Sequence, residues 1–201
     1  MAIRTANNQS MSAITALPSG VSAQSLILLS TFTSDGSDDT ATFASSIDST
    51  YKEYIFKWAD IHPETDNVSF QVNFRDGGSS YDATKTSSAF TAYNDEAGTD
   101  AALGYSGSND LAQATGVQTL LGSLGNGNDE STSGELILYD PSSTTYVKHY
   151  VAKIQYYNRS DYSQIYYIAG YCNVTAAIDG VQFSMSSDEI QGGTIKMYGV
   201  V

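Results

Sequence analysis

A series of long strand-like stretches separated by turn residues constrains the fold of this chain most, and it is clearest between Gly134 and Val201. Side chains point alternately to the two faces of a β-strand, so a period of two predicts strands with two distinct faces. In Tyr146–Tyr157, for example, one face carries Tyr146, Lys148, Tyr150, Ala152 and Ile154. The C-terminal third therefore predicts β-strands over residues 135–139, 146–157, 164–175, 178–185 and 193–199.

The same pattern recurs earlier, where turn residues separate further predicted strands at 25–33, 40–44, 51–61, 68–74 and 87–93. Long windows with apolar residues at helical spacing are absent, while 15 tyrosines and abundant Ser and Thr favour sheet. About ten strands joined by turns predict an all-β fold, an antiparallel β-sandwich of jelly-roll type. The predicted core contains Tyr54, Phe56, Trp58, Phe70, Val72, Phe183 and Ile195.

Two segments depart from this pattern. Residues 1–20 are polar and irregular, which predicts an extended N-terminal arm ahead of a single β-domain at residues 21–201. We expect the arm to anchor the protein to a neighbouring subunit or a larger assembly, through Ile3, Arg4, Met11 and Leu17. Residues 94–133 are rich in Gly, Asn, Asp, Ser and Ala, and there we predict a long functional loop with one short strand near 117–121 and one helical turn.

The charge balance argues against two classes of partner. The chain has nine Lys and Arg against 22 Asp and Glu, a net charge of −13 at pH 7. Such a chain repels the phosphates of nucleic acid and of anionic membranes, so neither is an expected partner. With a single cysteine, Cys172, no disulfide can form within the chain, and no apolar run predicts a secretion signal or a membrane span. These features predict assembly in a reducing cytoplasm.

The residues that carry most enzyme chemistry are few. His62 and His149 are the only histidines, and no Gly-x-Ser-x-Gly nucleophile motif accompanies them. Glu53 and Asp60 lie near one strand, but nothing in their spacing indicates that they converge as the two carboxylates of a glycosidase. We therefore expect no catalytic residue and no cofactor.

Two loops offer clusters of oxygen ligands, the kind that calcium prefers. They contain Asp35, Asp38 and Asp39 in one case, and Asn126, Asn128, Asp129 and Glu130 in the other. Neither loop has the spacing of an EF-hand, so we expect solvated turns in which these side chains bond to nearby backbone. Calcium binding is the alternative that the sequence leaves open.

The segment from Tyr156 to Tyr171 is dense in tyrosine. Alternate tyrosines in a strand face the core, and the others lie on the surface of the sheet. Exposed tyrosine suits subunit interfaces, and aromatic rings also stack on sugar rings. We expect Tyr157, Tyr162, Tyr167 and Tyr171 to contact another subunit or a glycan.

Several short stretches in a fixed order give the chain a family resemblance. They are Ser49–Tyr54, Ile61–Pro63, Asp110–Gln113, Pro141–His149, Ala169–Tyr171, Ala177–Ser187 and Gly193–Gly199. The set resembles a family of β-rich virion structural proteins of tailed phages, common in marine and cyanobacterial phages. The resemblance extends over most of the chain, from Leu26 onward.

The resemblance implies a non-catalytic component of the virion surface, either a capsid decoration or cement protein, a head fibre or a tail-fibre domain. The sequence lacks a long heptad shaft, which favours a small accessory protein. The family-level expectation is a homotrimer bound to phage capsid or tail proteins. A receptor-binding module that contacts a host surface glycan through residues 94–133 is the first alternative, and a depolymerase-type enzyme is the second.

Overall fold

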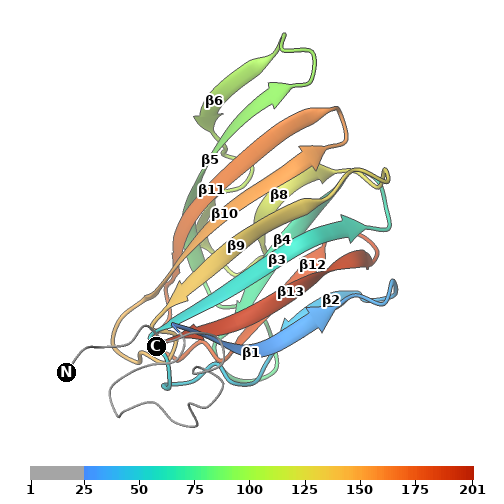
Figure 1. Cartoon of the computed structure of the whole chain (residues 1–201). Helices are drawn as coiled ribbons and strands as arrows, with labels where there is room; N and C mark the ends of the chain where they lie inside the picture. Colours follow the sequence, from blue (N-terminus) through green and yellow to red (C-terminus); the bar gives the residue numbers. More distant parts are fainter. Residues whose placement is uncertain (1–24) are drawn as a thin grey trace, which may run out of the picture.

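The computed structural model describes residues 25–201. The predicted arm, with Ile3, Arg4, Met11 and Leu17, lies outside the described residues. The described part of the chain folds into 13 β-strands and contains no helix (Figure 1). In chain order the strands are β1 (Leu26–Thr33), β2 (Thr40–Phe43), β3 (Glu53–Pro63), β4 (Val68–Arg75), β5 (Lys85–Asp95), β6 (Ala101–Tyr105), β7 (Leu111–Ala114), β8 (Gln118–Leu124), β9 (Thr132–Tyr139), β10 (Lys148–Asn158), β11 (Tyr162–Cys172), β12 (Gly180–Met185) and β13 (Ile190–Val200).

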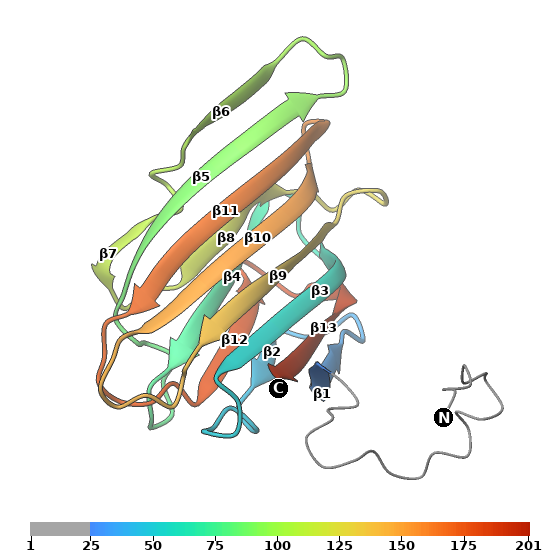
Figure 2. The ribbon, with the colours of Figure 1, turned by 60° about the vertical axis from the view of Figure 1, so that its left-hand side comes forward.

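The strands form two layers that nearly close into a barrel. The large layer runs β1-β13-β3-β9-β10-β11-β5, with β6 and β7 both paired to β5, and the small layer runs β8-β4-β12-β2 behind it (Figure 2). The layers meet where Asn158 at the end of β10 pairs with Leu124 of β8, and again where Asp38 before β2 bridges to Ile190 of β13. Every strand pair is antiparallel, which confirms the prediction of an all-β antiparallel fold.

One half of the interior, here called the aromatic half, is packed with rings from β2, β3, β4 and β12. It consists of Phe43, Phe56, Trp58, Phe70 and Phe183. Phe70 and Phe183 stack with ring centroids 5.7 Å apart, and Trp58 meets Phe70 edge-on at 5.6 Å. All seven residues predicted for the core are buried, so the assignment of faces from alternation is confirmed. Burial of these rings is the main source of stability that the fold offers.

The packing around Trp58 requires a glycine on the neighbouring strand. A Cβ atom at Gly134 in β9 would lie 2.7 Å from a ring carbon of Trp58 and 2.6 Å from the Lys153 carbonyl oxygen. Both contacts are too close for real carbon atoms, and the backbone oxygen cannot move away as a flexible side chain could. Gly134 therefore lets the indole lie directly against the sheet.

The other half of the interior, here called the polar half, lies beneath β5, β10 and β11. It consists of Asn73, Lys85, Gln118, Lys148, Tyr150 and Cys172. Lys148 and Lys85 flank Cys172 across neighbouring strands, and none of the three is exposed to solvent. The Tyr150 hydroxyl donates to Gln118 Oε1 over 2.8 Å. Each of these polar groups therefore needs a hydrogen-bond partner inside the protein.

The prediction of a long loop over residues 94–133 is wrong, whereas the short strand predicted near 117–121 is confirmed as β8 (Gln118–Leu124). That segment forms β6, β7 and β8, and the described structure contains no helical turn there. β8 carries Leu120, Leu121 and Leu124 into the core, but its spacing is broken by irregular pairing with β4, which hides the alternation in the sequence. β6 is exposed along its whole length and is held by its pairing with β5, so tertiary hydrogen bonding forms a strand where composition predicts none.

Candidate functional site

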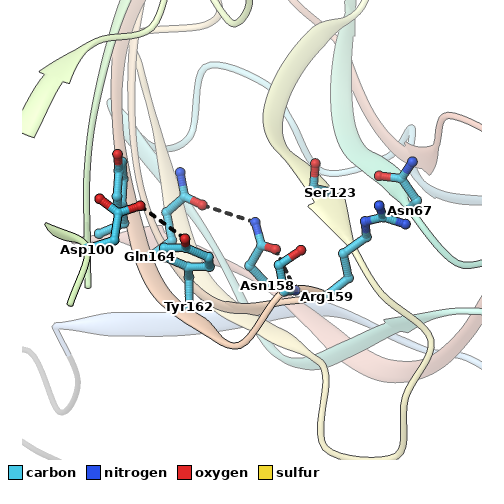
Figure 3. A pocket seen from close by; sticks show the side chains of 9 residues that line it. Asn67, Asp100, Ser123, Asn158, Arg159, Tyr162 and Gln164 are labelled. Atoms are coloured by element: carbon cyan, nitrogen blue, oxygen red, sulfur yellow. Dashed lines mark hydrogen bonds between the residues drawn. The ribbon is translucent and has the colours of Figure 1, made fainter. Parts of the chain in front are cut away.

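A polar pocket of about 340 Å³ lies at one end of the space between the two layers (Figure 3). Its lining residues are Asn67, Tyr93, Asp100, Ser123, Asn158, Arg159, Ser160, Tyr162 and Gln164. Asn158 and Gln164 occupy positions of β10 and β11 in phase with the buried residues Tyr156 and Tyr166. The pocket is therefore the mouth of the nearly closed barrel, a common location for ligand sites in β-proteins.

Three backbone positions beside this pocket have positive φ without being glycine. They are Asn67 (62°), Ser123 (59°) and Asp161 (65°). In the turn between β10 and β11, Asn158 Oδ1 accepts from the Ser160 N–H over 2.9 Å and the Asn158 carbonyl accepts from the Asp161 N–H over 3.0 Å. Such left-handed conformations persist only where the surroundings hold them, so the rim of the pocket has a defined shape.

One wall of the pocket is a chain of hydrogen bonds. The Tyr162 hydroxyl donates to Asp100 Oδ2 over 3.0 Å, and Asn158 Nδ2 donates to Gln164 Oε1 over 3.2 Å (Figure 3). The buried Tyr156 hydroxyl donates to the same Gln164 oxygen over 2.7 Å. The bond to the Asp100 carboxylate raises the pKa of Tyr162, so its hydroxyl stays a donor. These bonds fix the polar groups before any ligand arrives.

The opposite wall carries a cation. The Arg159 backbone N–H donates to the Ser123 carbonyl over 3.2 Å, which places its side chain beside Asn67 (Figure 3). Arg159 Nη1 lies 3.3 Å from Asp66 Oδ2, and both side chains are about half exposed. An ion pair this exposed is weak, so the guanidinium keeps donors for an incoming carboxylate or hydroxyl.

A second candidate surface is the outer face of the large layer. One cross-strand row, here called the outer row, contains Lys196, Lys57, Glu135, Lys153, Tyr167, Phe90 and Tyr105, each in register with the next. Lys57 Nζ lies 3.1 Å from Glu135 Oε2, and Phe90 stacks on Tyr167 with centroids 5.0 Å apart. The row places three of the nine basic residues of an acidic chain on one face.

A parallel row on the same face is apolar. This apolar row contains Leu28, Tyr198, Ile55, Ile137, Val151 and Ala169, again in register from strand to strand. Leu28 is 51% exposed and Val151 is 39% exposed. Among the described residues no element covers this face, which lies in front in Figure 2. A continuous apolar stripe across a sheet face is a feature of interaction surfaces.

The structure separates the four candidate tyrosines into two groups. Tyr162 lines the pocket, whereas Tyr167 lies in the outer row and Tyr171 lies on the same face, edge-on to His149. The Tyr157 hydroxyl donates to Asp161 Oδ1 over 2.9 Å, and this carboxylate raises the pKa of Tyr157. Alternation explains the separation, because Tyr162 differs in strand phase from the other three.

The histidines lie on different strands. His62 of β3 bonds through Nε2 to the Gly127 carbonyl at 3.0 Å, and His149 of β10 lies on the outer face. Glu53 begins β3, whereas Asp60 lies within its second half at a positive φ of 55°. Within residues 25–201, no three His, Cys, Asp or Glu side chains gather as a metal site would require.

The acidic loops use their side chains locally. Asp35 Oδ1 accepts from the N–H and the hydroxyl of Ser37 at 3.1 and 2.7 Å, which lowers the pKa of Asp35. Asp38 Oδ2 accepts from the Asp35 N–H at 2.9 Å. In the second loop, Glu130 Oε2 accepts from the Gly127 N–H over 2.5 Å. These are the backbone-capping bonds expected of polar turns.

Sequence reasoning missed most of the pocket. Asn67, Ser123, Arg159 and Gln164 come from three separate parts of the chain, and no local spacing connects them. The lysines of the outer row carried a usable signal, since Lys57 and Lys153 occupy the outward positions of strands whose inward positions are apolar. A search for charge on the outward face of predicted strands would have found them.

Comparisons of the chain with protein-family models, with curated proteins and with solved structures found no match. Inspection of residues 25–201 also finds no helix capable of spanning a membrane. Function must therefore be argued from the two surfaces described above.

Proposed function

We propose that this chain is a non-catalytic structural protein of a phage virion surface, which assembles with copies of itself through the outer face of the large layer. The observation that carries the proposal is that this face combines an apolar row, exposed at Leu28 and Val151, with a concentration of lysines. Aromatic and apolar residues are what subunit interfaces bury at their centres. In a chain of net charge −13, the lysines complement the acidic surface of a second copy.

The sequence resemblance to virion proteins of tailed phages supplies the setting for this assembly. Under the proposal, the protein decorates or cements a capsid after assembly in the host cytoplasm, and a closed ring of three copies is the expected form. The fold would then be a variant of the jelly-roll type, an architecture used by viral capsid proteins. Phage capsid or tail proteins would be the other partners, with residues 1–20 as the anchor.

The assembly face can be tested by one substitution on each outer surface of the molecule. Val151→Asp places a charge in the middle of the apolar row, and Gln71→Asp places the same charge on β4 of the small layer. We expect light scattering to give an oligomer for the unmodified protein and for Gln71→Asp, and a monomer for Val151→Asp. A monomeric unmodified protein at all concentrations, or an oligomer in both variants, contradicts the assigned face.

Location on the particle requires its own measurement. A map of the intact virion should show this fold on the capsid surface, with the outer faces of neighbouring copies in contact. Deleting residues 1–19 should leave the domain folded and abolish incorporation into particles. Normal incorporation of the truncated protein would show that the arm is not the anchor.

The pocket favours a second function, binding of a host surface glycan. Amide, hydroxyl, carboxylate and guanidinium groups converge there with two aromatic rings, since Tyr93 lies edge-on to Tyr162 at 5.5 Å. Sugars are recognised by such mixtures of stacking and hydrogen bonds. Carboxylated sugars would use Arg159 as their partner.

Glycan-array binding tests this second function. Tyr162→Ala should abolish array signals, and Tyr146→Ala, which removes a tyrosine 73% exposed and outside the pocket, should leave them unchanged. No binding by the unmodified protein would remove the glycan function and leave the assembly proposal intact. Turnover of host polysaccharide would instead establish the depolymerase alternative.

A further inference from the structure

An amine and an amide lie side by side in the polar half of the interior. Lys85 begins β5 of the large layer and Asn73 belongs to β4 of the small layer. Lys85 Nζ donates to Asn73 Oδ1 over 2.5 Å and to the Ala83 carbonyl over 2.6 Å. Lys85 has no exposed surface, and Asn73 retains 8%. The contact joins the two layers in a place that water does not reach.

The amide of Asn73 is arranged as an electrophile. Its Oδ1 accepts from the Phe74 N–H over 3.0 Å as well as from Lys85, so the backbone N–H polarises the carbonyl and still faces the oxygen when Lys85 Nζ turns toward the carbon. The Thr115 carbonyl lies 3.4 Å from both Asn73 Nδ2 and Lys85 Nζ. The carbonyl carbon is one bond, about 1.2 Å, from Oδ1, so a small rotation of the lysine chain brings Nζ to face it.

A fraction of the Lys85 side chain is present as the neutral, reactive amine. Burial lowers the pKa of Lys85 from 10.5 to about 8, so about a tenth of the side chain is neutral at pH 7. The groups that act on it electrostatically are Cys172 of β11 and the carboxylates of Asp82 and Asp76 in the loop before β5. Burial keeps the Cys172 thiol protonated, with its pKa raised to about 12. The amine is therefore the nucleophile of this cluster.

We propose that Lys85 and Asn73 join covalently, as an isopeptide bond between Lys85 Nζ and Asn73 Cγ. The neutral amine attacks Cγ, a C–N bond forms, and an electron pair moves onto Oδ1, which keeps the Phe74 N–H as its donor. The carbonyl forms again as the Cγ–Nδ2 bond breaks, one proton passes from Nζ to Nδ2, and ammonia leaves. The reaction needs no oxidant, metal or cofactor, because it exchanges one amide for another.

The other buried lysine, Lys148, lacks a side-chain partner of the kind that Lys85 has. Lys148 Nζ donates to the carbonyls of Val174 and Ala176, each over 2.6 Å, and to that of Ser143 over 3.2 Å. All three are backbone carbonyls, and no side-chain amide or carboxylate accepts from it within the described residues. Lys148 is therefore equally buried but has no partner with which to form the bond, which makes it the internal control.

The proposal is tested by the mass of the purified full chain under denaturing conditions. We expect a mass lower than that of the sequence by one molecule of ammonia. Trypsin should fail to cut after Lys85 and should release residues 58–75 linked to residues 76–148, while it cuts normally after Lys148. A full sequence mass, or normal cleavage after Lys85, overturns the proposal. A succinimide at Asn73 would also lose ammonia, but it would leave Lys85 open to trypsin and so counts against the bond.

Substitutions at the two positions give a distinct mass pattern. Asn73→Asp offers a carboxyl group in place of the amide, and its link should form with loss of water instead of ammonia. Lys85→Met should restore the full mass of its own sequence, whereas Lys52→Met, whose side chain is 77% exposed, should keep the loss of ammonia. Because the peptide map of the unmodified protein decides the question alone, a variant that fails to fold does not affect the outcome.

Discussion

The aromatic half and the polar half of the interior are equally buried but make different demands on the chain. Phe43, Phe56 and Phe183 meet through ring edges and faces, and their contacts depend on shape alone. Lys148 and Gln118 instead depend on particular acceptors and donors at hydrogen-bond distance. An apolar core tolerates substitution by residues of similar volume, whereas a buried polar network fails when one partner is lost.

The two halves also contribute differently to the free energy of folding. The aromatic half supplies most of the free energy of folding through buried area. The polar half gives up some of that gain, since each buried polar group must first lose its water. It holds instead the chemistry for a covalent link between the layers and the strands that lead to the pocket. Apolar packing and buried hydrogen bonding are therefore concentrated in different halves of one core.

The largest expected effect is in the aromatic half. Trp58→Ala should lower the free energy of unfolding by about 3–5 kcal/mol, because it leaves a cavity among Phe70, Phe183 and Gly134. Urea denaturation followed by circular dichroism measures the loss. Val117→Ala, at a valine that is 39% exposed and outside both candidate surfaces, is the matched control and should cost less than about 1 kcal/mol. A loss below that value at Trp58 would show that the two faces of β3 had been exchanged.

In the polar half, Lys148→Met should lower the free energy of unfolding by about 1–3 kcal/mol despite its similar volume, because backbone carbonyls lose their charged donor. Lys153→Met, on the exposed side of the same strand, should change it by less than about 0.5 kcal/mol. Urea midpoints of the two variants give the comparison. Equal midpoints would mean that shape alone governs the polar half as well.

A loss of similar size is expected where the aromatic half meets the sheet. Gly134→Ala should destabilise the protein by about 1–3 kcal/mol, because the new methyl group overlaps Trp58 and the Lys153 carbonyl. Gly104→Ala in β6 has open space around it and should have little effect on thermal unfolding. Stabilisation by Gly134→Ala would mean that the Trp58 ring can shift, and that the aromatic half is loosely packed.

The smallest effect is a dependence on pH that belongs to the polar half. Burial lowers the pKa of Lys148 below its ordinary 10.5, so the folded state releases this proton first as the pH rises. Stability from Lys148 therefore increases with pH up to the unfolded pKa. Titration of the Cys172 thiol changes the stability in the opposite direction. Its raised pKa stabilises the folded state below pH 9, and this stabilisation is lost as the pH rises from 9 to about 12.

The difference in urea midpoint between the unmodified protein and Lys148→Met, followed as the pH rises toward 10.5, isolates the lysine contribution because the Cys172 contribution is common to both proteins. We expect this difference to increase slightly in favour of the unmodified protein. Lys85 does not titrate once it is linked to Asn73, so it adds nothing to the increase in linked protein. A difference that stays constant with pH would assign the effect to another group.

Much of the fold follows from the sequence because alternation is a local signal. It placed Trp58, Phe70 and Phe183 in the core, and it put Lys148 on the same face as Tyr150, Ala152 and Ile154, all of which are buried. Alternation could not indicate that the Lys148 amine would find hydrogen-bond acceptors on the buried face. That depends on loop carbonyls at Val174 and Ala176, which approach only in the folded structure.

The candidate site was less accessible to sequence reasoning. Tyr162 could be named because it lies in a segment visibly rich in tyrosine, but its partner Asp100 lies 62 residues away. The strands β6 and β7 were missed because their Ala, Gly and Gln residues have low strand propensity, and pairing with β5 overrides it. Long-range hydrogen bonds, which no window of sequence contains, decide both cases.

The place of β13 between β1 and β3 has a consequence for how the molecule comes into being. β13 is made after every other described strand, yet it is the direct neighbour of the first, with Thr33 and Thr194 facing each other across 161 residues. During synthesis, β1 and one edge of β3 stay unpaired until β13 has been made. Domains with strand pairs so far apart in the sequence fold slowly, and their unpaired strand edges can associate with other chains in the meantime. These edges therefore need protection from other chains until β13 has been made.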